Sequence, residues 1–280
     1  MPGHVVRLEL DKKLLLNYAR RVNKPSYDEG YLVKGALRAA VADDDSYRPR
    51  PYSMEPERGG RIPILGYCLR PAEEILERMR NFGDPEGCNI VAMDTVFSKP
   101  LPEEWPEHVG FSVRVYPYIN STVEVKRARE RPPQRRVPSP PAPRVIRREP
   151  ESHSRDVDYF DYAASKRPDI SRDEAYSEWL KWSFACAAGM MYGRHHDVAV
   201  AEVEAIAVEN SGAEIIEAQM IDYSRVCSYR HERMVRMTSV KMAGVLRIAD
   251  QQKFGGFLTN GVGRQKFAGY GMLKLHPLPQ

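Results

Sequence analysis

The amino-acid sequence predicts an α+β protein of two domains, each with helices covering one face of an antiparallel sheet. Segments with the two-residue alternation of strands are interspersed with segments that have the apolar spacing of amphipathic helices. The chain has 280 residues and 42% hydrophobic residues, which is enough for two packed cores. An arginine- and proline-rich stretch interrupts the second half, and we expect it to be an insertion.

In the first half, we expect strands at 4–10, 61–67 and 87–93 and helices at 12–22, 26–41 and 71–82. Asp11 suits the cap of the first helix, and Ser26 with Glu29 forms a capping box for the second. The third helix carries an apolar face made of Ile75, Leu76, Met79 and Phe82. This order of elements favours a ferredoxin-like sandwich for residues 1–108.

Residues 109–280 form the second predicted domain, which begins with an alternating strand at 110–116. Ser171 and Glu174 make a capping box before a helix that ends near Gly193. We expect strands at 198–208, 235–248 and 272–275, with the insertion at about 126–170.

Basic residues are concentrated in the expected insertion, although the net charge is only +4. Residues 126–148 contain one acidic residue, Glu130, and nine basic residues: Lys126, Arg127, Arg129, Arg131, Arg135, Arg136, Arg144, Arg147 and Arg148. Arginine can bind phosphate through two parallel hydrogen bonds, which favours an arm that orders on nucleic acid. The interspersed prolines equally fit a solvated, extended linker, and both interpretations remain open.

Membrane, secretion and metal functions find no support in the sequence. The apolar runs are far shorter than the roughly 20 residues that span a bilayer, and charges interrupt the N-terminal segment. The four cysteines lie far apart without a CxxC pair, which is typical of free thiols in a reducing compartment. We therefore expect a cytoplasmic protein without a metal or cofactor.

A glycine-rich loop near the C-terminus suits contact with phosphates. It contains Gly261, Gly263, Arg264, Lys266, Gly269 and Gly271. Glycine tolerates positive φ angles, and successive N–H groups in such a loop can bind an anion. The GxGxxG spacing of dinucleotide-binding loops is absent, and no Gly-Lys-Ser/Thr follows as in a Walker loop. The alternative is a plain glycine-rich hairpin before the last strand.

The order of these C-terminal segments resembles the CasE family of CRISPR repeat-RNA endonucleases. The resemblance lies in Val240–Leu246, the glycine-rich loop and the Leu-rich strand after it. Residues 86–91 resemble a strand near the end of that family's first domain, 110–117 the opening of its second, and 171–191 a helix within it. The resemblance implies two tandem ferredoxin-like (RRM-like) domains, with the arginine-rich insertion in the second. The implied partners are a CRISPR repeat RNA stem-loop and other effector-complex subunits.

The family's reaction implies a set of catalytic residues. It needs no metal, because the ribose 2′-OH attacks the adjacent phosphate to leave a 2′,3′-cyclic phosphate and a 5′-OH. A Tyr-x-x-His pair on a first-domain helix serves this reaction; Tyr31 matches the tyrosine, whereas Lys34 stands in place of the histidine. Lysine, with a pKa near 10.4, is mostly protonated at neutral pH and suits charge stabilisation.

Further cations are expected to complete this site. Arg38 shares the helix face of Lys34, and Arg20 and Arg21 lie on the preceding helix. An arginine-based site with an arginine-rich insertion resembles the processing subunits of type IV CRISPR systems. The alternative is that Lys34 and Arg38 form a solvated helix face.

A second basic segment interleaves Arg230, Arg233 and Arg236 with Tyr223 and Tyr229. Such a pattern suits base stacking and phosphate contact, or else an exposed hairpin. His195 and His196 are adjacent, which is typical of a surface loop rather than a metal site.

The resemblance therefore implies a metal-independent endoribonuclease that cleaves CRISPR precursor RNA at the repeat stem-loop and stays bound as an effector subunit. The main alternative is a non-catalytic subunit that only binds the RNA hairpin. A more distant one is an RNA-binding module outside CRISPR systems.

Overall fold

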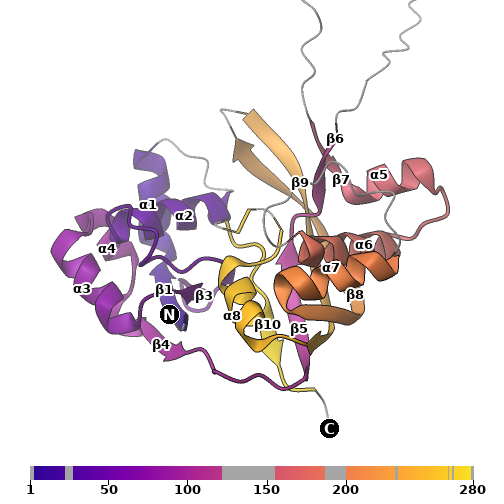
Figure 1. The fold of residues 1–280 in the computed structure, drawn as a ribbon. Helices are drawn as coiled ribbons and strands as arrows, with labels where there is room; N and C mark the ends of the chain where they lie inside the picture. The colour runs from indigo at the N-terminus through magenta and orange to yellow at the C-terminus, as the bar shows by residue number, and fades with distance from the viewer. Residues whose placement is uncertain are drawn as a thin grey trace, which may run out of the picture.

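The computed structural model describes residues 3–22, 28–121, 155–186, 200–230, 233–263, 265–266 and 268–278 (Figure 1). The first half contains β1 (His4–Asp11), α1 (Lys12–Arg21), α2 (Glu29–Ala40), β2 (Tyr52–Met54), β3 (Arg61–Cys68), α3 (Ala72–Phe82), α4 (Pro85–Ile90), the 3-10 turn η1 (Met93–Thr95) and β4 (Phe97–Pro100). The second half contains β5 (His108–Val115), β6 (Tyr118–Ser121), β7 (Arg155–Asp158), α5 (Tyr159–Lys166), α6 (Arg172–Ala185), α7 (Val200–Ser211), β8 (Ala213–Arg230), β9 (Arg233–Ile248), α8 (Gln251–Asn260) and β10 (Lys274–His276).

Two antiparallel sheets share one topology. The first has the strand order β2-β3-β1-β4 and the second the order β10-β5-β9-β8. In each, a central strand leads through helices into a hairpin, and a further helix leads to the strand that pairs with the other side of that central strand. This is the ferredoxin-like arrangement, so the α+β class with two tandem ferredoxin-like units is confirmed. A domain boundary at residue 108 stays a prediction.

Most of the predicted strands and helices are present. The alternating segments near 4–10, 61–67, 110–116 and 235–248 form β1, β3, β5 and β9, and the helices near 12–22 and 71–82 are α1 and α3. Asp11 caps α1 by accepting a hydrogen bond from the Leu14 N–H (2.9 Å). Ser171 caps α6 in the same way, with the Glu174 N–H as donor (3.1 Å).

Several predicted elements are wrong. The strand expected at 87–93 is helix α4, because Asp84 caps it and Pro85 occupies its first turn. The strand expected at 198–208 overlaps helix α7. Helix α2 begins at Glu29 with Asp28 as its cap, so the predicted start at Ser26 is wrong; Ser26 itself lies outside the described residues. The last strand, β10, begins two residues later and ends one residue later than predicted.

Part of the expected insertion belongs to the folded second unit. Strand β7 pairs with β6, and helix α5 follows it directly. Asp158 links them to the sheet: its carboxylate accepts hydrogen bonds from the Phe160 N–H (2.9 Å), the Tyr176 hydroxyl (3.1 Å) and the Thr238 hydroxyl. Burial raises the pKa of Asp158. Residues 122–154, which contain the nine basic residues, lie outside the described part.

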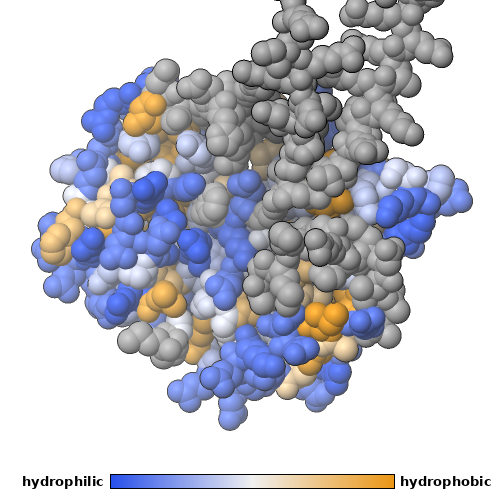
Figure 2. Space-filling view, turned by 45° about the horizontal axis from the view of Figure 1, so that its top comes forward, coloured by the Kyte–Doolittle hydropathy of each residue, from blue (hydrophilic) through white to orange (hydrophobic). Residues whose placement is uncertain are grey.

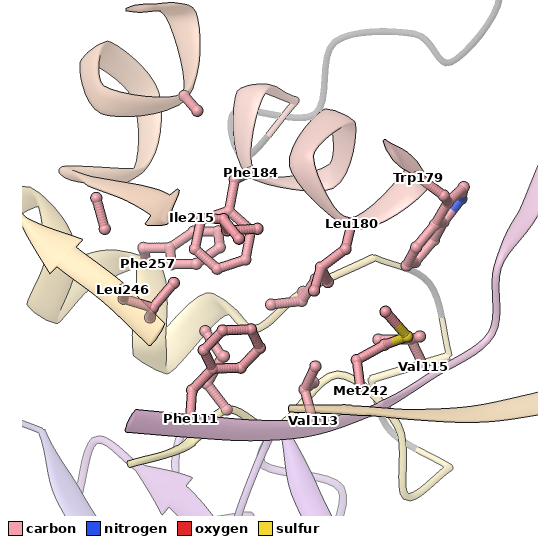
Figure 3. Packing of buried hydrophobic residues seen from close by; sticks show 14 of the residues in the cluster. Phe111, Val113, Val115, Trp179, Leu180, Phe184, Ile215, Met242, Leu246 and Phe257 are labelled. Atoms are coloured by element: carbon pink, nitrogen blue, oxygen red, sulfur yellow. The ribbon is translucent and has the colours of Figure 1, made fainter. Parts of the chain in front are cut away.

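The core of the second unit lies between its sheet and its helices (Figure 3). Figure 3 shows Phe111, Val113 and Met242 on strands facing Leu180 and Phe184 of α6. The same cluster includes Tyr67 of β3 and Leu273, and the Tyr67 hydroxyl donates a 2.5 Å hydrogen bond to the Leu273 carbonyl. The two units are therefore joined through a buried contact.

No helix among the described residues is long and apolar enough to cross a bilayer. On the face shown in Figure 2, the coloured residues are mostly hydrophilic, and the apolar ones form separate small groups.

Candidate functional site

A pocket of about 700 Å³ lies along helices α1 and α2 and the segment that follows α3. Tyr31, Lys34 and Arg38 of α2 line it together with Arg21 of α1. Four of the five predicted catalytic residues therefore meet at one place. Arg20 is exposed on α1 and does not line this pocket.

The sequence of α2 explains this arrangement. Tyr31, Lys34 and Arg38 follow one another at spacings of three and four, so they share a helix face. The opposite face packs into the first core through the buried residues Val33, Ala36, Leu37 and Ala40. The cap bond from the Tyr31 N–H to Asp28 (3.1 Å) fixes where the helix begins.

Ion pairs hold two of the pocket arginines. The Arg38 Nε lies 2.5 Å from an Asp43 carboxylate oxygen, and the Arg21 guanidinium contacts Glu86. The Lys34 ammonium lies 5.8 Å from the centre of the Tyr31 ring, within the range of a cation–π interaction. Three cations are thus gathered beside a tyrosine, and the two arginines among them are paired with carboxylates.

Four further lining residues were not predicted as parts of the site. Asp43 and Asp84 add carboxylates, Tyr18 adds a half-buried phenol, and Phe82 adds an exposed ring. Burial and then the charge of Asp84 raise the pKa of Tyr18. Phe82 was expected on the apolar face of its helix, but it is 63% exposed whereas Ile75 is buried. The Asp84-Pro85 pair is a helix-start signal, but it does not place Asp84 beside the end of α2.

The glycine-rich loop has the backbone that its sequence predicts. Gly261, Gly263, Gly269 and Gly271 all have φ between +67° and +86°. A Cβ on Gly261 would lie 2.6 Å from Pro51, one on Gly263 would lie 2.7 Å from Trp179, and one on Gly271 would overlap the Val262 carbonyl. These glycines therefore permit close packing against the protein itself.

The remaining predicted RNA-binding residues that the structure describes do not line the pocket. Lys266 is half-buried in the glycine-rich loop, and burial followed by the charge of Arg50 lowers its pKa. Arg236 is exposed on β9 opposite Cys227 of β8. Arg230 and Arg233 pair at the end of the β8–β9 hairpin, which continues beyond the last residues of β9 that pair with β5.

Other candidates lie outside the described residues: Arg264, Lys126, Arg127, Arg129, Arg131, Arg135, Arg136, His195 and His196. Within the described ranges, no group of three or more His, Cys, Asp or Glu side chains could hold a metal ion.

Comparison with known proteins places this fold in a family. A search of curated proteins finds no match. Two solved structures share the fold at 16% sequence identity, each covering 99% of this chain and 100% of its own. One, with a TM-score of 0.55, is Thermus thermophilus Cse3 bound to an RNA representing a pre-cleavage complex. The other, with a TM-score of 0.54, is the CRISPR endoribonuclease Cse3 bound to a 19-nucleotide RNA. The sequence model of the CRISPR associated protein family matches residues 13–277, so the chain belongs to that family.

Proposed function

We propose that this protein is a metal-independent endoribonuclease that cleaves CRISPR precursor RNA at the repeat stem-loop and stays bound as an effector-complex subunit. The observation that carries the proposal is the pocket lined by Tyr31, Lys34, Arg38 and Arg21. Family membership and the fold shared with an RNA-bound CRISPR endoribonuclease support the choice of substrate.

The reaction asks the pocket to move two protons and to stabilise one charged intermediate. The 2′-OH loses its proton as its oxygen bonds to phosphorus, and the P–O5′ bond breaks as O5′ gains a proton. Between these events the phosphorus carries five oxygens and additional negative charge. The guanidinium of Arg38 and the ammonium of Lys34 are suited to binding those oxygens.

Tyr31 and Lys34 are the groups proposed for the proton transfers. The Lys34 ammonium donates a proton to the departing O5′. The Tyr31 phenol in the same pocket orients the 2′-OH, which gives its proton to a solvent water molecule as its oxygen attacks. Positioning of the scissile phosphate over α2 would accelerate the step further, because the attacking oxygen must align with the bond that breaks. Arg20, which lies outside the pocket lining, is proposed to contact the RNA backbone.

The RNA itself would be held by residues outside the pocket. Lys266 of the glycine-rich loop and Arg236 of the β8–β9 hairpin are proposed to contact phosphates, as are the basic residues near 126–136. A stem-loop is recognised mainly through its backbone and shape, which suits cations spread over several elements. Persistent binding after cleavage would make the protein a subunit of the effector complex.

The second candidate is a non-catalytic subunit that binds the RNA hairpin. Two observations favour it. Lys34 stands where the resembling family has a histidine, and no histidine of the described residues lines the pocket. Asp43 also pairs with Arg38, which reduces the positive charge available to a phosphate. If the protein is an enzyme, the more specific proposal is an arginine-based catalytic site that resembles those of type IV processing subunits.

End-labelled repeat RNA incubated with purified protein in EDTA tests the proposal. Wild type should cut at one position and leave a 2′,3′-cyclic phosphate. Lys34→Ala and Arg38→Ala should each slow cutting about 100-fold or more, since each removes a group that stabilises developing charge. Lys13→Ala is the matched control, because Lys13 is an exposed cation of α1 that does not line the pocket.

The outcomes separate the two candidates. Tight hairpin binding without any cut by wild type would identify the structural subunit instead. Cutting that stops in EDTA and returns with a divalent cation would contradict metal independence. Equal cutting by all four proteins would show that the pocket is not the catalytic site.

A further inference from the structure

An exposed aromatic ring stands at the edge of the candidate pocket. Phe82 is the last residue of α3 and lines the pocket together with Lys34 and Arg38, yet it is 63% exposed. Phe97 on the edge strand β4 is similarly exposed (56%) but does not line this pocket. The two phenylalanines therefore differ in what lies beside them, not in how much solvent they meet.

One side of the Phe82 ring is covered by a fixed cation. The Arg78 guanidinium carbon lies 4.5 Å from the centre of the Phe82 ring and 5.6 Å from that of Tyr47. Arg78 is itself held, because its Nε donates to the Val41 carbonyl (3.3 Å) and its guanidinium lies 3.9 Å from Asp44. Arg78 thus lies within cation–π distance of both Tyr47 and Phe82, and it covers one side of the Phe82 ring.

The position of this ring is fixed relative to the pocket cations. Immediately after Phe82, the Asp84 N–H donates to the Ala39 carbonyl (3.0 Å). Gly83 passes so close to the Ala40 carbonyl that a Cβ atom there would overlap it. Both carbonyls belong to the last turn of α2, the helix that carries the two cations. The end of α3 is therefore joined to the end of that helix.

We propose that Phe82 is a stacking platform for an RNA base next to the phosphate that Lys34 and Arg38 bind. The proposal rests on the proposed function, because it takes RNA as the substrate. A base on the solvent side of Phe82 would stack on the phenylalanine ring. Every base has a flat aromatic face, so this contact is tolerant of RNA sequence. Holding the neighbouring base fixes the ribose and phosphate between them, which favours in-line attack by the 2′-OH.

Binding of an uncleavable repeat RNA tests the platform. The RNA carries a 2′-deoxy group at the nucleotide that wild type cuts and 2-aminopurine in turn at each flanking position. Loss of one base–aromatic stack should weaken binding by Phe82→Ala about 5- to 100-fold and remove fluorescence quenching at one flanking position. Phe82→Trp should retain both affinity and quenching. Phe97→Ala should behave as wild type, since Phe97 lies outside the pocket.

Each other outcome has a distinct meaning. If Phe82→Ala binds and quenches as wild type does while wild type still cuts RNA, the platform is wrong and the proposed function stands. If Phe82→Trp binds as weakly as Phe82→Ala, stacking is not the cause, and the platform is wrong. If Phe82→Ala impairs only assembly with a protein subunit, the ring serves a protein interface instead. A wild type that neither binds nor cuts the RNA would overturn both proposals.

Discussion

Replacing Gly263 by alanine tests whether packing against the second unit holds the glycine-rich loop in place. Gly263 has a φ of +67°, where an L-residue pays about 1–2 kcal/mol. Its Cβ would lie 2.7 Å from the Cη2 atom of Trp179, well inside normal carbon–carbon contact. Trp179 is 1% exposed, so its ring cannot move aside without disturbing the core.

These two contributions give the expected magnitude. Backbone strain of about 1–2 kcal/mol and overpacking of about 1–3 kcal/mol should together lower the free energy of unfolding by about 2–5 kcal/mol. Gly59→Ala is the control, because Gly59 has a φ of +57° and nothing lies within 4 Å of its Cβ position. It should lose only the backbone contribution, about 1–2 kcal/mol.

Thermal melting of both variants measures the difference. For a chain of this size, each kcal/mol lowers the melting temperature by about 2–4 °C, so Gly263→Ala should melt several degrees below Gly59→Ala. Equal losses in the two variants would refute the packing argument and leave backbone strain as the only cause. An RNA-binding loss in Gly263→Ala without loss of stability would instead favour direct contact between this glycine and phosphate.

Three other substitutions probe different parts of the fold. Lys266→Met should raise the melting temperature at neutral pH, because burial and Arg50 lower the pKa of Lys266; this advantage should shrink as pH rises toward 10.5, where wild type no longer buries the charge. It should also weaken RNA binding and flatten its salt dependence if Lys266 contacts a phosphate. Tyr67→Phe removes the 2.5 Å bond to the Leu273 carbonyl and should lower the free energy of unfolding by about 1–3 kcal/mol, measured by denaturant titration. Gly255→Ala, in helix α8 with nothing near its Cβ position, should raise stability by about 0.5–1 kcal/mol in the same titration.

The sequence predicted those elements whose apolar pattern and end signals agree. Strand β1 alternates and ends at Asp11, which caps α1. The end of the strand and the start of the helix are therefore both signalled by local sequence. Helix α8 cannot be predicted from local propensity because Gly255 and Gly256 interrupt its centre; the packing of Phe254, Phe257 and Leu258 into the second core compensates for them. Helix α7 was mistaken for a strand because its valines suggested one, whereas the buried spacing of Val203 and Ala207 is helical.

The candidate site likewise contains residues that local sequence predicts together and residues that it does not. Tyr31, Lys34 and Arg38 could be placed together from the sequence, since one helix carries all three at turn spacing. Asp84 and Phe82 could not, because they reach the pocket only through the contact between the ends of α2 and α3. That contact depends on the close approach of Gly83, which a linear pattern does not reveal.

The ion pairs in the pocket determine how readily it can accept a phosphate. Arg38 pairs with Asp43 and Arg21 with Glu86, so an incoming phosphate must displace or share these carboxylates. The two arginine side chains are 55% and 64% exposed, and ion pairs in such positions contribute only about 0–1 kcal/mol. A phosphate that binds arginine through two parallel hydrogen bonds can compete at that cost, and the additional charge of the pentacoordinate intermediate competes better still. The carboxylates therefore keep the empty pocket close to neutral, and in the proposed reaction the more highly charged intermediate would compete for the arginines better than the bound substrate would.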